Sequence, residues 1–379
     1  MANQTQPALP AADGLYIGLM SGTSADGVDA VLARFQASQP PACLAAVSVP
    51  MPDALRHEIL ALNLPGADEL HRSMLAANAL ADLYADAVGA VLRAAHTPAA
   101  EVMALGAHGQ TVRHRPELGY TVQLNAPARL AERTGIRVVS DFRSRDVAAG
   151  GQGAPLVPAF HAALFAAAQP RAILNLGGIA NVTALSPGAP VTGWDTGPAN
   201  VLLDLWASRH LGASYDENGR WAASGTSDHA LLAYLIDSEP WLAQPPPKST
   251  GRDLFNAAWL DERLAAWTRQ HGARDPADIQ ATLLALTVHT VADAVRKWMV
   301  APEALYVAGG GARNAALMAG LKTALGISVV PTDELGVPAQ DVEAFAFAWL
   351  AYAHMAGLTG SLPDVTGASA PRVLGSLTP

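Results

Sequence analysis

Residues 15–29 read LYIGLMSGTSADGVD, and residues 171–183 read RAILNLGGIANVT, followed by GWDTGPAN at 193–200. Both stretches have the same order: an apolar strand, a small Gly-rich turn and a second apolar strand. A turn without Cβ atoms brings backbone N–H groups close together, and such a concavity binds phosphate oxygens. Two of them in one chain predict a site for a nucleoside triphosphate, although each alone also fits an ordinary hairpin turn.

The pattern around these loops predicts a mixed α/β fold that is duplicated. Apolar runs at 15–20, 28–35 and 43–49 indicate an antiparallel meander, and helical spacing follows over 69–95 before a buried strand at 102–105. A Gly/Pro-punctuated segment at 148–158 suggests a boundary, so we expect one domain over 1–155 and a second over 156–339. The second repeats the hairpin at 172–185, with helices at 199–210, 279–299 and 314–325 and a strand at 304–308. A strongly apolar helix at 341–355 lies in the remaining segment, 340–379, which we expect to pack back onto the first domain.

Composition excludes several classes of protein. The chain has 379 residues, 50% of them hydrophobic, a formal net charge of −9 and a single cysteine, Cys43. Its acidic balance argues against broad nucleic-acid binding, and one cysteine allows no internal disulfide. We find no secretory signal and no apolar stretch of membrane-spanning length, so we expect a cytoplasmic protein with a small-molecule partner and no membrane partner.

Several polar residues fall where chemistry is expected. Asp195 precedes a predicted helix and could simply cap it, but a carboxylate at a strand end beside phosphate loops also suits a general base. Gly309-Gly310-Gly311 and Asn314 follow a buried strand, as in a loop that approaches a ribose or a flat ring, or as in a plain strand-to-helix turn.

A second group of polar residues suits a hydroxylated or acidic ligand. His108, Gln110, Arg113, Arg143 and Arg145 follow neighbouring strand ends, and arginine grips carboxylates with paired donors. Glu343 lies on an apolar helix, where it either caps the helix or contacts a ligand from a core position.

The motifs taken together resemble those of the anhydro-N-acetylmuramic acid kinase family, in the actin, Hsp70 and sugar-kinase superfamily. The resemblance covers nearly the whole chain. It rests on seven segments, namely 18–29, AHGQT at 107–111, DFR at 141–143, 150–158, NLGGIAN at 175–181, DTGP at 195–198 and GGGARN at 309–314.

The resemblance implies a two-domain actin-like ATPase fold of the sugar-kinase type with a central nucleotide cleft. It also implies ATP- and Mg²⁺-dependent conversion of 1,6-anhydro-N-acetylmuramic acid and water to N-acetylmuramic acid 6-phosphate in cell-wall recycling, and a homodimer. Asp195 would be the catalytic base, and His108, Gln110, Arg143 and Glu343 would bind the sugar. The implied ATP-binding residues are Gly22, Thr23, Ser24, Ala25, Asp26, Gly27, Val28, Asp29, Gly177, Gly178, Gly309, Gly310, Gly311 and Asn314.

One departure concerns the metal. The superfamily's first phosphate loop usually has an Asp two residues before its first Gly, where this chain has Met20. Asp26 is therefore the expected Mg²⁺ ligand, ahead of Asp29. Two other functions remain open from the sequence: a kinase or phosphatase acting on another sugar, and an ATP-dependent scaffold without sugar chemistry.

Overall fold

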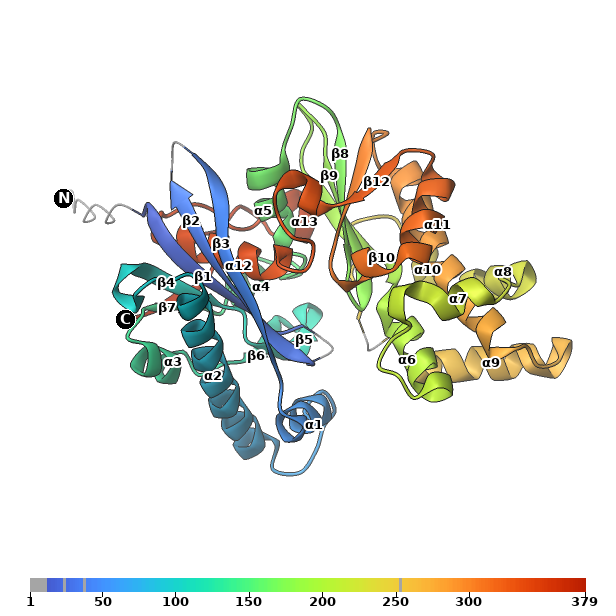
Figure 1. Ribbon diagram of the computed structural model, residues 1–379, viewed down its shortest axis with the longest axis horizontal. Helices are drawn as coiled ribbons and strands as arrows, with labels where there is room; N and C mark the ends of the chain where they lie inside the picture. The colour runs from blue at the N-terminus through green and yellow to red at the C-terminus, as the bar shows by residue number, and fades with distance from the viewer. Residues whose placement is uncertain (1–11, 23–24, 37–38, 252–253) are drawn as a thin grey trace. The chain divides into compact units, whose positions relative to one another are not determined.

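The computed structural model describes residues 12–22, 25–36, 39–251 and 254–379. The chain forms two compact units (Figure 1). Unit 1 comprises residues 1–160 and 341–379, and unit 2 comprises residues 161–340. The change from one to the other falls inside helix α5 (Val157–Phe165), whereas the sequence analysis placed it at residue 155.

Unit 1 is built on a six-stranded sheet. Its strand order is β13-β7-β4-β1-β2-β3; β1, β2 and β3 form an antiparallel meander, β4 and β7 continue from β1 in parallel, and β13 pairs antiparallel with β7. The strands are β1 (Gly14–Met20), β2 (Gly27–Gln36), β3 (Gln39–Pro50), β4 (Val102–Ala107), β7 (Val138–Ser140) and β13 (Ser376–Thr378), and a separate hairpin joins β5 (Gln110–Arg115) to β6 (Tyr120–Leu124). The helices are α1 (Asp53–Ala61), α2 (Glu69–Ala94), α3 (Pro127–Thr134), α4 (Ser144–Ala148), α12 (Val342–Met355) and α13 (Pro363–Thr366).

Helices cover both faces of this sheet. Successive residues of a strand point to opposite faces. Leu32 of β2 belongs to the core formed with α2, while Phe35 stacks on Tyr352 of α12 with ring centroids 5.1 Å apart. Because these two residues lie an odd number of positions apart, α2 and α12 occupy opposite faces.

Two neighbouring glycines let α12 lie directly on the sheet. Gly18 of β1 pairs with Gly106 of β4. A Cβ on Gly18 would be 1.8 Å from the carbonyl oxygen of Ala344, and one on Gly106 would be 2.0 Å from that of Phe347. Real Cβ atoms never come so close, so the helix seats against backbone that no side chain covers.

Helix α2 is long and apolar enough to cross a membrane by length and composition alone. Its most apolar window has a mean hydropathy of 1.3. Half of that window is buried in unit 1, where Leu80, Tyr84 and Val88 pack against β2 and β3. This is the pattern of a core helix in a globular unit.

Unit 2 repeats the sheet topology of unit 1. Its strand order is β10-β9-β8-β11-β12, with an antiparallel meander of β8, β9 and β10 followed by β11 and β12 in parallel. The order matches β3-β2-β1-β4-β7, so the duplicated α/β fold predicted from the two Gly-rich hairpins is confirmed. The strands are β8 (Arg171–Leu176), β9 (Ile179–Leu185), β10 (Thr192–Pro198), β11 (Ala304–Ala308) and β12 (Ser328–Pro331).

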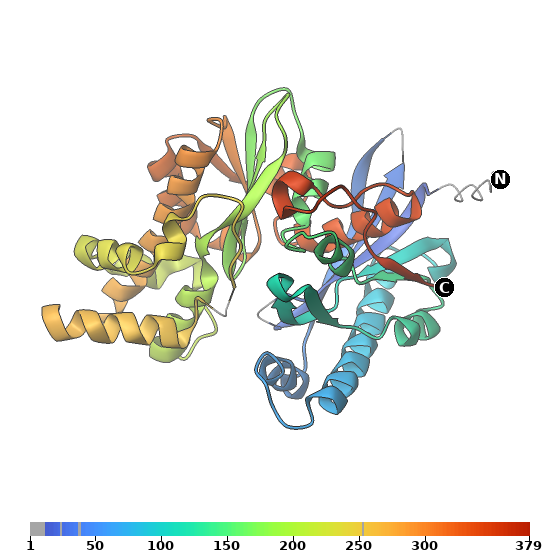
Figure 2. The same ribbon diagram turned by 180° about the vertical axis from the view of Figure 1, so that it is seen from behind.

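The helices of unit 2 form two cores. One core lies between the sheet and the helices α10 and α11, and these two helices lie side by side in the views of Figures 1 and 2. The second core joins α6, α8 and α9 to the N-terminal half of α10. These helices are α6 (Asn200–Leu211), α7 (Arg220–Ser224), α8 (His229–Asp237), α9 (Ala257–His271), α10 (Pro276–Trp298) and α11 (Ala315–Leu325). The sequence analysis did not predict α7, α8 or α9.

Candidate functional site

The first Gly-rich loop connects β1 to β2 in unit 1, and Gln110 ties it to the rest of the unit. The Ser21 hydroxyl donates to Gln110 Oε1 at 2.5 Å, and Gln110 Nε2 donates to the Gly22 carbonyl at 3.1 Å. Both side chains are buried. Gln110, predicted to bind sugar, therefore uses its amide to shape the loop.

The remaining predicted loop residues differ in exposure. Ala25 has a positive φ of 48° and donates its N–H to the Gly22 carbonyl at 3.0 Å. Asp26 is exposed, Gly27 and Asp29 are half-buried, and Val28 is buried in β2. Thr23 and Ser24 lie outside the described residues.

His108 and Arg143 are brought together in unit 1. Arg143 Nε and Nη2 lie 3.2 and 2.9 Å from His108 Nε2, and Nη1 donates to the Gly153 carbonyl at 2.8 Å. Burial, reinforced by the Arg143 charge, holds the pKa of His108 well below its usual value. The imidazole is therefore neutral, and its Nε2 accepts from the guanidinium.

The other two predicted arginines lie elsewhere. Arg113 forms an ion pair with Glu69 at 2.6 Å, and Arg145 donates to the Val373 carbonyl at 3.0 Å. The cluster of polar residues predicted after the strand ends thus reduces to His108 and Arg143, because the other side chains have partners within unit 1.

Glu343 is not fully buried, although the apolar sequence around it suggested a core position. It lies in the first turn of α12, half-buried, next to Asp341 at the start of the helix. An acidic side chain at this position interacts favourably with the helix dipole.

The second Gly-rich loop, Gly177-Gly178, joins β8 to β9 in unit 2 and packs on the start of α6. The Gly178 carbonyl accepts from the N–H groups of Ala199 and Val201, and the Gly177 carbonyl accepts from that of Asn200. The carbonyls of the loop are thus directed to α6.

The third loop requires glycine because it packs against β8. Gly309 has a φ of +82°, and a Cβ there would lie 2.5 Å from Asn175 Oδ1; a Cβ on Gly311 would lie 2.5 Å from Leu176 Cβ. A Cβ on Gly310 would meet Asn200 Nδ2 at 3.9 Å, an ordinary contact distance. Asn314 caps α11, since its Oδ1 accepts from the Leu317 N–H at 3.0 Å. Two of the three glycines are therefore explained by packing alone.

Asp195 is buried in β10, at 9% exposure. Its Oδ2 accepts from the Thr250 N–H at 2.8 Å, and its own N–H donates to the Lys248 carbonyl at 3.1 Å. It caps no helix: β10 runs on to Pro198, and Ala199 is the N-cap of α6. A buried carboxylate positioned by backbone donors suits a general base.

Comparison with known proteins decides the family. The sequence profile of the anhydro-N-acetylmuramic acid kinases matches residues 14–379. The chain belongs to the anhydro-N-acetylmuramic acid kinase family. It is 64% identical over 365 residues to the anhydro-N-acetylmuramic acid kinase of Bordetella petrii, and the alignment covers 96% of each chain. It is 55% identical over 375 residues to that of Paraburkholderia xenovorans, and this alignment covers 97% of the present chain and 98% of the relative.

A solved structure aligns with most of the chain at a much lower sequence identity. Component A of (R)-2-hydroxyglutaryl-CoA dehydratase from Acidaminococcus fermentans aligns over 90% of this chain and 99% of its own, with a TM-score of 0.49 and 12% identity. Membership of the anhydro-N-acetylmuramic acid kinase family confirms that the protein is a kinase that uses ATP. The scaffold alternative is set aside.

Sequence reasoning missed Lys248 and Thr250. Both lie in the segment PPPKSTG at 245–251, to which the motifs in the sequence assign no role. Thr250 acts through its backbone N–H, which every residue but proline has, and its partner is 55 positions away. No local pattern in the sequence reports such a contact.

The metal ligand predicted from this kinase family is Asp26. Among the described residues, no group of three His, Cys, Asp or Glu side chains could hold a metal ion. Asp26 offers an exposed carboxylate next to the first loop, and oxygen donors of this kind are what Mg²⁺ prefers when phosphates and waters complete its shell.

Proposed function

We propose that the protein phosphorylates O6 of 1,6-anhydro-N-acetylmuramic acid while it hydrolyses the anhydro bond, consuming ATP and water and releasing N-acetylmuramic acid 6-phosphate and ADP. Its family membership over residues 14–379 supports the substrate, and the buried Asp195 carboxylate held by the Thr250 N–H supports the chemistry. The product returns a cell-wall sugar to metabolism.

The proposed reaction needs one base and one phosphoryl donor. The Asp195 carboxylate accepts a proton from water, and the water oxygen bonds to C1 of the sugar as the C1–O6 bond breaks. The electron pair of that bond goes to O6, which attacks the γ-phosphorus of ATP, and the bond to the ADP oxygen breaks. The leaving group of the hydrolysis is thus the nucleophile of the phosphoryl transfer.

The loops at 22–29, 177–178 and 309–311 are the proposed ATP-binding segments, with Asn314 beside the last. Asp26 would ligate Mg²⁺, which when bound neutralises charge on the phosphates. Gly310 is exposed, and it is the glycine of its loop at which an added Cβ would meet no atom closer than 3.9 Å, which supports close approach of a ligand to the backbone.

His108 and Arg143 are the proposed sugar-binding pair of unit 1. The neutral imidazole fixes the guanidinium through Nε2, and an arginine held in this way meets a carboxylate with a geometry set in advance. The lactyl carboxylate of the sugar is the group that it would bind. Gln110 contributes through the loop that it shapes, and Glu343 is proposed as a further sugar contact.

Replacing Arg143 with alanine is expected to raise the KM for the sugar about 10- to 100-fold, because a charge-assisted hydrogen bond contributes roughly 1.5–3 kcal/mol. The KM for ATP should change little. Steady-state kinetics measure both constants. Arg145→Ala is the matched control, because the Arg145 side chain donates to the exposed backbone carbonyl of Val373. An unchanged sugar KM in Arg143→Ala would place the carboxylate site elsewhere.

ADP release tests the proposed function. Purified protein with Mg·ATP is assayed with no sugar, with 1,6-anhydro-N-acetylmuramic acid, with its analogue lacking the lactyl group, and with glucose. We expect ADP release that depends on the anhydro sugar and is weakest with glucose. Sugar-independent ADP release, or a preference for glucose, would contradict the proposed substrate.

We further propose a cytoplasmic homodimer. The dimer follows from the family resemblance, and unit 1 supports it with exposed apolar side chains at the start of α2: Leu70 is 79% exposed, and Met74, one helical turn on, is 54% exposed. Exposed apolar patches of this kind mark association surfaces.

The double variant Leu70→Glu, Met74→Glu is expected to be a monomer in light scattering where the parent protein is a dimer, because two charges would have to be buried at the interface. Leu118→Glu, at a residue that is 62% exposed in another part of unit 1, is the matched control. A dimeric double variant would exclude this patch as the interface.

A further inference from the structure

Two hydrogen bonds join the catalytic strand β10 to the segment Lys248–Thr250. One runs from the Asp195 N–H to the Lys248 carbonyl, and the other from the Thr250 N–H to Asp195 Oδ2. Because the second bond reaches a carboxylate oxygen, a shift of this segment would change both the position and the basicity of the carboxylate.

The side chain of Lys248 ties the same segment to a short 3₁₀ helix, η4 (Pro240–Ala243). Its Nζ donates to the Leu242 carbonyl at 2.8 Å and to the Trp241 carbonyl at 3.3 Å, and it lies 4.3 Å from the centroid of the Trp241 ring. Burial lowers the pKa of the amine to about 8. Such a desolvated amine is stabilised by these contacts.

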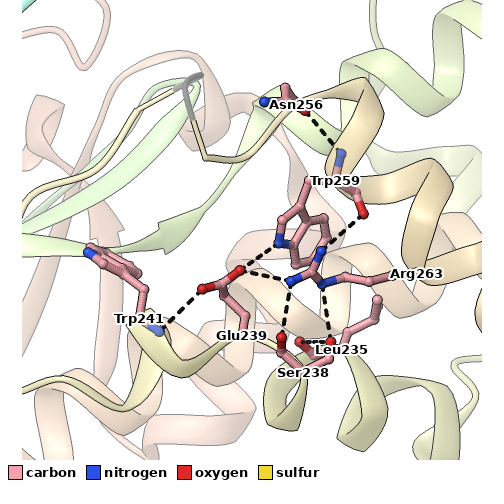
Figure 3. A network of polar contacts seen from close by, with 7 residues as sticks. All are labelled: Leu235, Ser238, Glu239, Trp241, Asn256, Trp259 and Arg263. Carbon is pink, nitrogen blue, oxygen red and sulfur yellow. Dashed lines mark hydrogen bonds and ion pairs between the residues drawn. The ribbon is translucent and has the colours of Figure 1, made fainter.

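A buried carboxylate holds η4 in turn (Figure 3). Glu239, 7% exposed, accepts from the Trp241 N–H at 3.2 Å, from Trp259 Nε1 at 2.8 Å and from Arg263 Nη2 at 3.0 Å. Its charge is paired with Arg263 and both of its carboxylate oxygens accept hydrogen bonds, so the position of the side chain is fixed. A chain of contacts thus runs from Glu239 through η4 and Lys248 to Asp195.

We propose that Lys248 is a positioning residue for Asp195: its side chain fastens the segment Lys248–Thr250 to η4, and the fastened segment holds the carboxylate in place for proton transfer. The inference rests on the proposed role of Asp195 as base. Two other roles for Lys248 are direct sugar binding and simple lining of the pocket of about 240 Å³ that it shares with Trp194 and Lys297.

Lys248→Met removes both donors and keeps the length of the chain. We expect kcat to fall about 10- to 100-fold, since a misplacement of about 1 Å costs up to this much. The KM for the sugar and for ATP should stay near the parent values. The acid limb of the kcat/KM profile should move to higher pH, because a carboxylate that loses an N–H donor and the nearby positive charge of Lys248 is less stabilised as the anion. A merely structural role would not move that limb.

Three variants accompany this measurement. Lys297→Met is the matched control, because Lys297 lines the same pocket but forms an ion pair with Asp293, one turn away in α10, at 2.9 Å. Lys248→Arg keeps donors for both carbonyls and should recover part of kcat and of the acid limb. If circular dichroism shows that Lys248→Met is unfolded, Lys248→Gln takes its place. Glutamine keeps an amide donor group, so kcat and the acid limb should change in the same direction but by less.

The outcomes separate the two proposals. An unchanged kcat and acid limb in folded Lys248→Met or Lys248→Gln would overturn the positioning role, as would a raised sugar KM with unchanged kcat, which would mean direct sugar binding. Asp195→Asn is assayed in parallel. Turnover at the parent rate in that variant would remove the base itself and with it the proposed mechanism, whereas failure in the lysine variants alone leaves the mechanism standing.

Discussion

Replacing Asp195 with asparagine is expected to lower sugar-dependent ADP release by about 10²–10⁴-fold, the usual contribution of a general base. The asparagine has the same shape and its side-chain oxygen can still accept from the Thr250 N–H, but the amide cannot take a proton from water. ATP affinity, measured by calorimetry, should be nearly unchanged.

Asp237→Asn is the matched control for this experiment. Asp237 is the last residue of α8 in the same unit and is exposed, so removal of its charge should leave turnover at the parent rate. Turnover near the parent rate in Asp195→Asn would show that another group activates the water. A loss of ATP affinity would instead place Asp195 in nucleotide binding.

Replacing Gly18 with alanine is expected to have the largest effect on stability. The new Cβ would lie 1.8 Å from the Ala344 carbonyl oxygen and 2.4 Å from the Ala348 nitrogen, both of which are backbone atoms of α12. These atoms cannot rotate away, and α12 is buried almost throughout. We expect a loss of about 3 kcal/mol or more in the free energy of unfolding, at the upper end of overpacking effects.

Urea unfolding followed by circular dichroism measures this loss. Gly89→Ala is the control: Gly89 lies within α2 of the same unit, and its added Cβ would meet only the flexible Arg93 guanidinium, at 3.2 Å. That change should be neutral or raise stability by up to about 1 kcal/mol, because alanine favours helix more than glycine does. An unchanged urea midpoint in Gly18→Ala would mean that α12 does not seat on Gly18.

The parts of the fold that could be predicted were those with a strong local period. The stripe of Leu80, Tyr84 and Val88 has helical spacing, and both Gly-rich hairpins join continuous apolar runs. Helix α2, the meander of unit 1 and the β8–β9 hairpin therefore follow from the sequence. Strand β5 is polar, QTVRHR, and was missed because its pairing with β6 comes from tertiary context.

Candidate site residues could be predicted from the sequence where the expected role belongs to a particular type of side chain. Asp195, His108 and Arg143 could be named from the sequence, and the structure pairs the last two directly. The functional use of backbone groups could not be named, since the Thr250 N–H carries no signature in the sequence. Asn314 and Gly309 show an ambiguity that the sequence cannot resolve, because helix capping and close packing select the same residues as a ligand site would.

The coupled reaction is tested most directly by turnover in ¹⁸O-labelled water, quenched early and analysed by mass spectrometry of the sugar product and its fragments. Attack of water on C1 predicts a product that has gained one phosphate and one water, with the label on the C1 hydroxyl and none in the phosphate group. Label in the phosphate group, or a phosphorylated sugar that has gained no water, would contradict the proposal that hydrolysis of the anhydro bond supplies the O6 nucleophile.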